Sequence, residues 1–168
     1  VSNHSFSETV YFDVIRKKTA ALFAACTEAA AYSVGVSEEE VKLARLLGEY
    51  IGICFQIKDD IFDYFDSKEI GKPTGNDMLE GKLTLPVLYA LNRANDNQAA
   101  EIALKVKEGT ATLAEIARLI AFTKENGGIE YAVRTMNAYK QKAFGLLASL
   151  PDSAICVALR SYLDYVVD

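Results

Sequence analysis

The chain has 168 residues, of which 51% are hydrophobic and 24% are charged, and its net charge is −5. This apolar content excludes a disordered chain and fits one domain, or a large piece of one, that buries a sizeable core. The acidic balance argues against nucleic-acid binding, and no apolar run approaches the ~18 residues of a transmembrane helix.

Helix signals begin near the N-terminus. Ser5 and Glu8 have capping-box spacing, and the residues that follow contain no helix breaker until a glycine ends the segment. Ser37 and Glu40 form a second predicted capping box, which opens a helix expected to cover about 38–66. We therefore expect two long helices in this part of the chain.

The rest of the chain continues with further helices. Thr84 and the pair Thr112–Glu115 are expected to cap two of them, and Gly127 with Gly128 to end one. No stretch alternates with the period of a strand, so the predicted fold class is an all-α bundle. The later helices are expected at 84–95, 99–109, 113–126, 129–150 and 153–167.

The three cysteines, Cys26, Cys54 and Cys156, lie far apart among apolar residues. Their odd number and their context favour reduced core thiols over a disulfide framework or a zinc site. Because reduced thiols are typical of the cytoplasm, we expect a cytoplasmic protein.

Acidic residues gather at the end of the second predicted helix. At ~100° per residue, Asp59 and Asp63 lie about 40° apart on its surface with Asp60 beside them. Gly52 and Gly48 continue this stripe, which we expect to face a polar cavity edged by small residues. Two explanations remain: a solvated acidic face, or a divalent cation that offsets the repulsion between like charges. The apolar remainder of the helix favours the cation, and Mg²⁺ with a phosphate ligand fits better than an EF-hand or a glycosidase carboxylate pair.

A loop that contains glycines, GKPTGND, follows the acids. The glycines free its backbone, and Lys72 offers an ammonium group suited to phosphate. Alone, such a string predicts only a turn, but its place about ten residues after the acids favours a phosphate site. Lys82, in GKLTLP, adds a second positive charge.

Three segments in this order, FQIKDDIFD, GKPTGND and GKLTLP, resemble the second aspartate-rich motif of the trans-type polyprenyl diphosphate synthases. Upstream, VIRKKTAALF resembles the segment in which that family carries a lysine–threonine pair. The resemblance implies an isoprenoid-synthase-type helical bundle around a deep cavity, usually in a homodimer. It also implies a reaction: an allylic diphosphate ionises, the double bond of isopentenyl diphosphate attacks the carbocation, and a proton is lost.

The same resemblance implies roles for individual residues. The carboxylates that hold Mg²⁺ would be those of Asp59, Asp60 and Asp63. The ammonium groups that bind the allylic diphosphate would be those of Lys18, Lys72 and Lys82. Lys18, Thr19 and Gln56 would be catalytic, the last two by stabilising positive charge with their dipoles. Phe55 would contact the isoprenoid chain. Without the resemblance, Lys18 would be an ordinary surface lysine and Phe55 a core aromatic.

The chain carries only the second of the family's two aspartate-rich motifs. It begins at Val1, and its methionines stand at positions 78 and 136, which favours a chain from which a part has been removed. Residues 1–168 would then be the C-terminal portion of a single domain, without the half that carries the first DDxxD motif. We expect the chain alone to be inactive.

Two other hypotheses stay open beside elongation. The first is a class I terpene cyclase, which the GKPTGND and GKLTLP segments argue against. The second is a non-catalytic subunit or interaction half of a heteromeric synthase, although such a partner has no need for clustered like charges. Among the elongating enzymes, the residues of VIRKKTAALF favour a resemblance to the bacterial long-chain enzymes that make quinone side chains.

Overall fold

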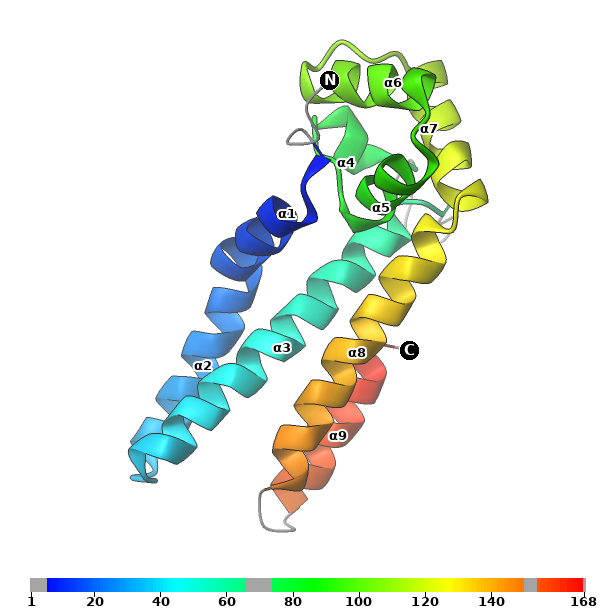
Figure 1. Cartoon of the computed structure of the whole chain (residues 1–168). Coiled ribbons are helices and arrows are strands. Elements are labelled where there is room, and N and C mark those ends of the chain that lie inside the picture. Colours follow the sequence, from blue (N-terminus) through cyan, green and yellow to red (C-terminus); the bar gives the residue numbers. More distant parts are fainter. Residues whose placement is uncertain (1–5, 66–73, 150–153, 168) are drawn as a thin grey trace. The chain divides into compact units, whose positions relative to one another are not determined.

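The structure is a computed structural model that describes residues 6–65, 74–149 and 154–167 (Figure 1). Every regular element in these ranges is helical and none is a strand, which confirms the all-α prediction. None of the described helices combines the length and the apolar composition that crossing a membrane requires.

The chain divides into two compact units. Unit 1 takes in Val1–Tyr11 and Asp59–Val133, and unit 2 takes in Phe12–Lys58 and Arg134–Asp168. The prediction of one domain over the whole chain stays a prediction.

Three consecutive helical segments stand where the sequence predicts one helix: α1 (Glu8–Ile15), the π-helix η2 (Arg16–Ala20) and α2 (Ala21–Ser33). In η2 the N–H of Ala21 reaches back five residues to the carbonyl of Arg16. The prediction of an unbroken α-helix is therefore wrong at this point, because no proline or glycine marks the wider turn. Ser5 of the predicted capping box lies outside the described residues, and Gly35, with φ of 71°, follows the end of α2 as expected.

The long helix α3 (Glu38–Phe62) begins as predicted but ends earlier. Ser37 and Glu40 exchange the two hydrogen bonds of a capping box, at 2.9 and 3.3 Å. After Phe62 the backbone tightens into a turn in which the N–H of Tyr64 bonds three residues back. Asp63 therefore lies beyond the helix, and not inside a helix that reaches residue 66.

Two glycines of α3 let η2 and α2 approach closely. A Cβ on Gly48 would lie 2.3 Å from Thr27 Oγ1, and a Cβ on Gly52 would lie 2.6 Å from Ala20 Cα. Both glycines are buried. The expected polar cavity along this part of the stripe is therefore wrong: helix–helix packing fills the space.

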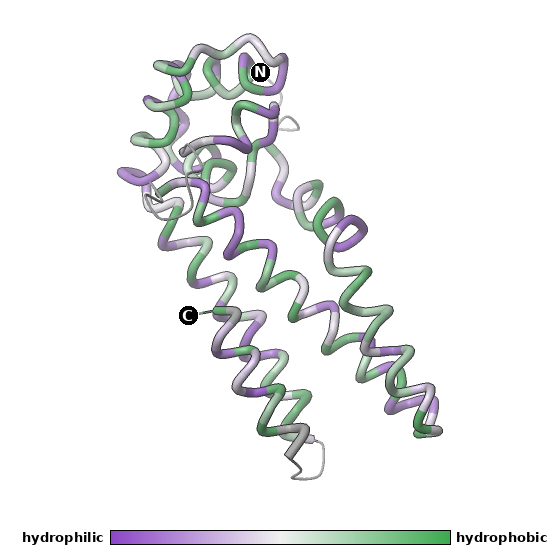
Figure 2. The backbone as a smooth tube through the Cα atoms, turned by 180° about the vertical axis from the view of Figure 1, so that it is seen from behind, coloured by the Kyte–Doolittle hydropathy of each residue, from purple (hydrophilic) through white to green (hydrophobic). Residues whose placement is uncertain are grey.

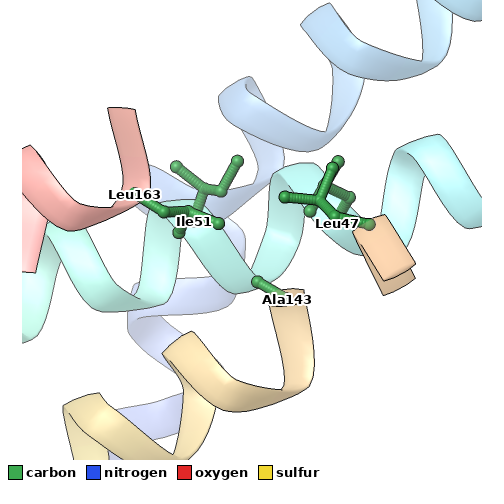
Figure 3. Packing of buried hydrophobic residues seen from close by; sticks show 5 residues of the cluster. Leu47, Ile51, Ala143 and Leu163 are labelled. Carbon is green, nitrogen blue, oxygen red and sulfur yellow. The ribbon is translucent and has the colours of Figure 1, made fainter. Parts of the chain in front are cut away.

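The core of unit 2 forms where α3 meets α8 (Gly128–Ala148) and α9 (Ala154–Val167). Figure 3 shows apolar side chains from the three helices converging there, and the buried cluster consists of Leu47, Ile51, Ala143, Leu147 and Leu163. Each buried leucine or isoleucine contributes about 1.5–3 kcal/mol relative to an exposed one. Figure 2 shows hydrophobic and hydrophilic residues alternating along the long helices, as amphipathic packing requires.

Among its described residues, unit 1 includes the shorter helices α4 (Asn76–Leu79), α5 (Leu85–Ala94), α6 (Asn97–Lys107) and α7 (Leu113–Glu125). Thr112 and Glu115 form the predicted capping box of α7, and Gly127, with φ of 74°, follows its end. Thr84 is the N-cap residue of α5, as predicted, although its side chain makes no capping hydrogen bond. Its hydroxyl lies instead 3.4 Å from the hydroxyl of the buried Tyr64.

The two cysteines whose side chains are described differ in environment. Cys54 is free and buried, and burial raises the pKa of its thiol to about 12. Cys26 is also free but exposed on α2, so its prediction as a core thiol is wrong.

Candidate functional site

Asp60 is the buried acid of the cluster. Only 2% of it is exposed, and its Oδ2 accepts a hydrogen bond of 2.6 Å from the hydroxyl of Tyr11 on α1. Burial, followed by the charge of Asp60, raises the pKa of Tyr11 well above its ordinary value. Tyr11 therefore remains a protonated donor, and it fixes the orientation of the Asp60 carboxylate.

Asp63 is half-buried and holds the start of α4. Its Oδ1 accepts the backbone N–H of Asn76 at 2.9 Å, and its Oδ2 accepts that of Asp77 at 3.0 Å. Backbone N–H groups at a helix start have no partner inside the helix, and a carboxylate satisfies them with a favourable charge. These bonds offset part of the repulsion that the acid cluster creates.

Asp59 is the exposed acid, and Asp77 joins the cluster from α4. Burial raises the pKa of Asp77 above its ordinary value, and the charges of Asp63 and Asp59 act in the same direction while Lys82 opposes them. Sequence reasoning assigned no role to Asp77, although it lies in the quoted GKPTGND segment. The missing signal was spatial, because only the fold of α4 returns this residue to the end of α3.

Lys82 lies close to carboxylates of its own turn. Its Nζ is 3.8 Å from Asp77 Oδ1 and 2.5 Å from Glu80 Oε2. The hydrogen bond with Glu80 is the main cause of a raised pKa of Lys82. The ammonium group is exposed, so an incoming anion can reach it. Lys72 lies outside the described residues.

Thr19 and Gln56 meet within unit 2. Thr19, in the π-helix η2, donates its hydroxyl to Gln56 Oε1 at 2.7 Å. Lys18 is exposed on the same turn. Phe55 is 45% exposed, and its ring centroid lies 5.5 Å from that of Phe23. Phe55 is therefore not the core aromatic of the alternative interpretation.

The acids suit a hard divalent cation, although they do not by themselves complete a metal site. Among the described side chains, no three His, Cys, Asp or Glu gather in a way that could hold a metal ion. Magnesium needs only one or two protein carboxylates when water and phosphate supply its other ligands. After burial, the charges of Asp63 and Asp59 also raise the pKa of Asp77, and a cation would offset this repulsion. The assignment of Asp59, Asp60 and Asp63 to the metal stays a prediction.

A separate pocket of about 300 Å³ in unit 1 is lined largely by α7. Its walls include Ile116, Ile120 and Leu113, with Lys124 and Tyr64 at polar positions. None of the predicted site residues that the structure describes is named among its walls.

The fold and the acidic cluster define a class: an all-α protein whose aspartates gather at the end of one long helix. A family model described as polyprenyl synthetase matches residues 1–123. The chain belongs to this family, and the resemblance stated from its motifs is confirmed.

Relatives and solved structures support the assignment. An octaprenyl diphosphate synthase from Haemophilus influenzae is 36% identical over 169 residues, which cover 100% of this chain and 51% of the relative. Heptaprenyl diphosphate synthase component 2 from Geobacillus stearothermophilus is 37% identical over 93% of this chain and 48% of its own length. The crystal structure of a geranylgeranyl pyrophosphate synthase from Bacteroides thetaiotaomicron has a TM-score of 0.94 and 80% identity, covering 98% of this chain and 54% of that one. The chain thus spans about half the length of the curated relatives it matches.

Proposed function

We propose that this chain is the C-terminal half of a prenyl diphosphate synthase, which adds isopentenyl diphosphate units to an allylic diphosphate. The observation that carries the proposal is the acidic end of α3, where Asp60 and Asp63 are fixed by hydrogen bonds and Asp59 is exposed beside them. Family membership supports the same conclusion. The complete synthase would be this chain joined to an N-terminal half with a DDxxD motif.

The residues of the acidic cluster and the lysines would handle the diphosphate. Asp59 would hold Mg²⁺, with Asp60 assisting from its fixed position. The metal, when bound, supplies Lewis-acid stabilisation of the departing diphosphate. Lys18, Lys72 and Lys82 would neutralise the remaining phosphate charge.

Thr19 and Gln56 would stabilise the allylic cation. Because Thr19 donates its proton to Gln56, its Oγ1 can present only lone pairs to any other group. An oxygen held in this way offers the negative end of a dipole to a developing positive charge. Phe55 would contact the isoprenoid chain through its exposed ring.

The complete synthase would act as a homodimer in the cytoplasm, and its product would serve as a quinone side chain. The octaprenyl and heptaprenyl names of the relatives support a long product, whereas the similar solved structure carries a geranylgeranyl name. A measurement of the chain length of the prenyl product decides between a long product and a geranylgeranyl product.

The test uses the complete synthase with farnesyl diphosphate, isopentenyl diphosphate and Mg²⁺. We expect linear elongation, which should stop when EDTA removes the metal. Asp59→Asn should lower the elongation rate at least about 100-fold, a loss of about 2.7 kcal/mol in transition-state stabilisation. Asp96→Asn is the matched control, because Asp96 caps α6 by accepting the N–H of Ala99. A cyclic product would favour the terpene cyclase, and full activity of Asp59→Asn would refute the proposal.

A second candidate is one component of a two-component synthase. The relative from Geobacillus stearothermophilus favours it, because its name counts it as component 2. Copurification of a second, different chain that is required for elongation would decide for this candidate, and elongation by a purified homodimer would decide against it.

A further inference from the structure

The single-turn helix α4 is anchored at its start by one residue, Asp63. Asp63 accepts the N–H of Asn76 and of Asp77 with its two carboxylate oxygens, at 2.9 and 3.0 Å. Its backbone carbonyl accepts the N–H of Gly75 at 2.9 Å. Three hydrogen bonds therefore join Asp63 to the start of α4.

The other end of α4 closes in a Schellman turn. Lys82 donates its N–H to the carbonyl of Asp77 at 2.8 Å, and Gly81 donates to that of Met78 at 3.1 Å. Gly81 has φ of 78°, the left-handed conformation that this helix ending requires. Lys82 is the next residue, so its backbone position is set by α4. We call Asp63 together with residues 75–82 the α4 bracket.

Tertiary packing holds the α4 bracket in unit 1. Met78 is buried, and α4 packs against α6 and α7. A Cβ on Gly75, which has φ of 81°, would lie 2.9 Å from both Ile116 and Ile120. A single helical turn is unfavourable by itself, because it fixes several residues for one hydrogen bond. The anchor at Asp63 and this packing are therefore what define the turn.

Asp63 does more than an ordinary helix cap. A Ser, Thr or Asn cap offers one acceptor oxygen, whereas Asp63 accepts two backbone N–H groups with its two oxygens. Here the charge of Asp63 is one of the causes that raise the pKa of Asp77, after burial. The charged anchor nevertheless holds Asp77 where its carboxylate lies 3.8 Å from the Lys82 ammonium group. Both the backbone and the side chain of Asp77 thus connect Asp63 to Lys82.

We propose that Asp63 is a positioning residue for Lys82, which acts through the α4 bracket to set where the ammonium group meets the diphosphate, and not a ligand of the metal. This replaces the metal-ligand role that the family resemblance implies for Asp63. The inference rests on the proposed function, because it takes Lys82 to bind the diphosphate.

The test measures the binding of two probes to the complete synthase: inorganic pyrophosphate in the presence of Mg²⁺, and Mn²⁺ alone. Asp63→Asn keeps one acceptor oxygen and loses the other, so we expect it to weaken pyrophosphate about tenfold and to change Mn²⁺ affinity less than about twofold. In turnover it should raise KM for the allylic diphosphate more than it lowers kcat. Asp59→Asn is the control and should weaken Mn²⁺ at least about tenfold.

A double-mutant cycle with Lys82→Ala separates positioning from a general structural effect. If Asp63 acts through Lys82, Asp63→Asn weakens pyrophosphate less than about twofold further once Lys82→Ala is present. Additive losses, or loss of Mn²⁺ affinity in Asp63→Asn equal to that in Asp59→Asn, would overturn the positioning role alone. Failure of the unmodified synthase to bind pyrophosphate would overturn the proposed function together with this inference.

A second variant keeps the test decisive if Asp63→Asn does not fold. Gly81→Ala strains the other end of the α4 bracket, and it should weaken pyrophosphate with the same non-additivity toward Lys82→Ala. Gly109→Ala is the matched control, since Gly109 has φ of 69° and nothing lies within 4 Å of the added Cβ. Equal pyrophosphate affinity in the two glycine variants would overturn the proposal.

Discussion

The three aspartates at the end of α3 share a sequence motif but have three different environments. Asp60 is buried against the hydroxyl of Tyr11, Asp63 holds the backbone of α4, and Asp59 is exposed. Each hydrogen bond to a carboxylate contributes about 1.5–3 kcal/mol. Internal bonds therefore offset much of the like-charge repulsion, and the proposed metal ion would have to offset only what remains.

Replacement of Tyr11 by phenylalanine should lower stability. The variant keeps the buried ring but removes the donor to Asp60, a loss of about 1.5–3 kcal/mol in the free energy of unfolding because the acceptor is a buried carboxylate. Urea denaturation of the variant and the unmodified protein measures the difference.

Tyr131→Phe is the matched control for this prediction. Tyr131 also donates to a carboxylate, that of Glu8 at 2.8 Å, but Glu8 is half-buried and water can replace the lost bond. We expect this control to cost less than about 1 kcal/mol. Equal losses in the free energy of unfolding of the two variants would show that the burial of Asp60 does not determine how much its hydrogen bond with Tyr11 contributes.

At the residue scale the sequence predicts that acidic residues gather, but not the partner of each. The spacing of four positions places Asp59 and Asp63 on one helix face, whereas α3 ends at Phe62 and Asp63 follows it. Tyr11 stands 49 positions from Asp60, and no local pattern connects them. Asp77 was missed for the same reason, since only the tertiary path of α4 returns it to Asp63.

The approach of η2 and α2 to α3 depends on glycine at two positions of α3. We expect Gly52→Ala to destabilise the protein by about 1–3 kcal/mol, because the new Cβ would lie 2.6 Å from the backbone of Ala20, which cannot move as a side chain can. Gly145→Ala in α8 is the control, since nothing lies within 4 Å of its Cβ. There we expect a gain of about 0.5–1 kcal/mol from reduced chain entropy. Denaturant unfolding of both variants should give changes of opposite sign, and two stabilised variants would refute the close packing.

The capping box of α7 should make stability depend on pH in the acid range. A hydrogen bond with Lys105, together with the backbone N–H of Thr112, lowers the pKa of Glu115 from 4.5 to about 2. Because the folded-state pKa is depressed, the charged carboxylate stabilises the folded chain above pH 4.5, and this contribution disappears as pH falls toward 2. We expect the stability difference between the unmodified protein and Glu115→Gln to be constant near neutral pH and to shrink through that window.

Glu40→Gln provides a comparison for the α7 prediction. The hydrogen bonds with Ser37 lower the pKa of Glu40, so the same direction of pH dependence is expected at the start of α3. A stability difference between the unmodified protein and Glu115→Gln that grows as the pH falls would contradict the prediction.

At the element scale, local signals located most helix ends, and failures occurred where the cause is not local. The capping boxes at Ser37 and Thr112 were correctly predicted because each is contained in four consecutive residues. The π-helix η2 has no breaker or cap in the sequence that would announce it, and the glycines that flank the single turn α4, Gly75 and Gly81, do not announce a helix between them. Both are defined by contacts with distant parts of the chain, such as the bond between Thr19 and Gln56.

At the scale of the whole molecule, the missing first motif and the length of the relatives lead to the same inference. The given sequence carries only the second aspartate-rich segment, and the relatives are about twice as long as the matched region. Under the proposed function, one acidic cluster would complete neither the metal set nor the enclosure of a carbocation. The exposed rings of Phe55 and Phe62, 45% and 59% exposed, leave apolar surface in contact with water that a shielding half would cover.

The chain alone should therefore fail to elongate. Incubated with farnesyl diphosphate, isopentenyl diphosphate and Mg²⁺, the 168-residue chain should give no longer prenyl product, since a reactive cation must be shielded from water. Addition of an N-terminal half with an intact DDxxD motif should restore turnover, whereas the same half with its aspartates changed to asparagine should not. Product analysis by mass spectrometry measures both. Elongation by the isolated chain would mean that one acidic cluster suffices for ionisation, and the assignment of separate tasks to two halves would have to be abandoned.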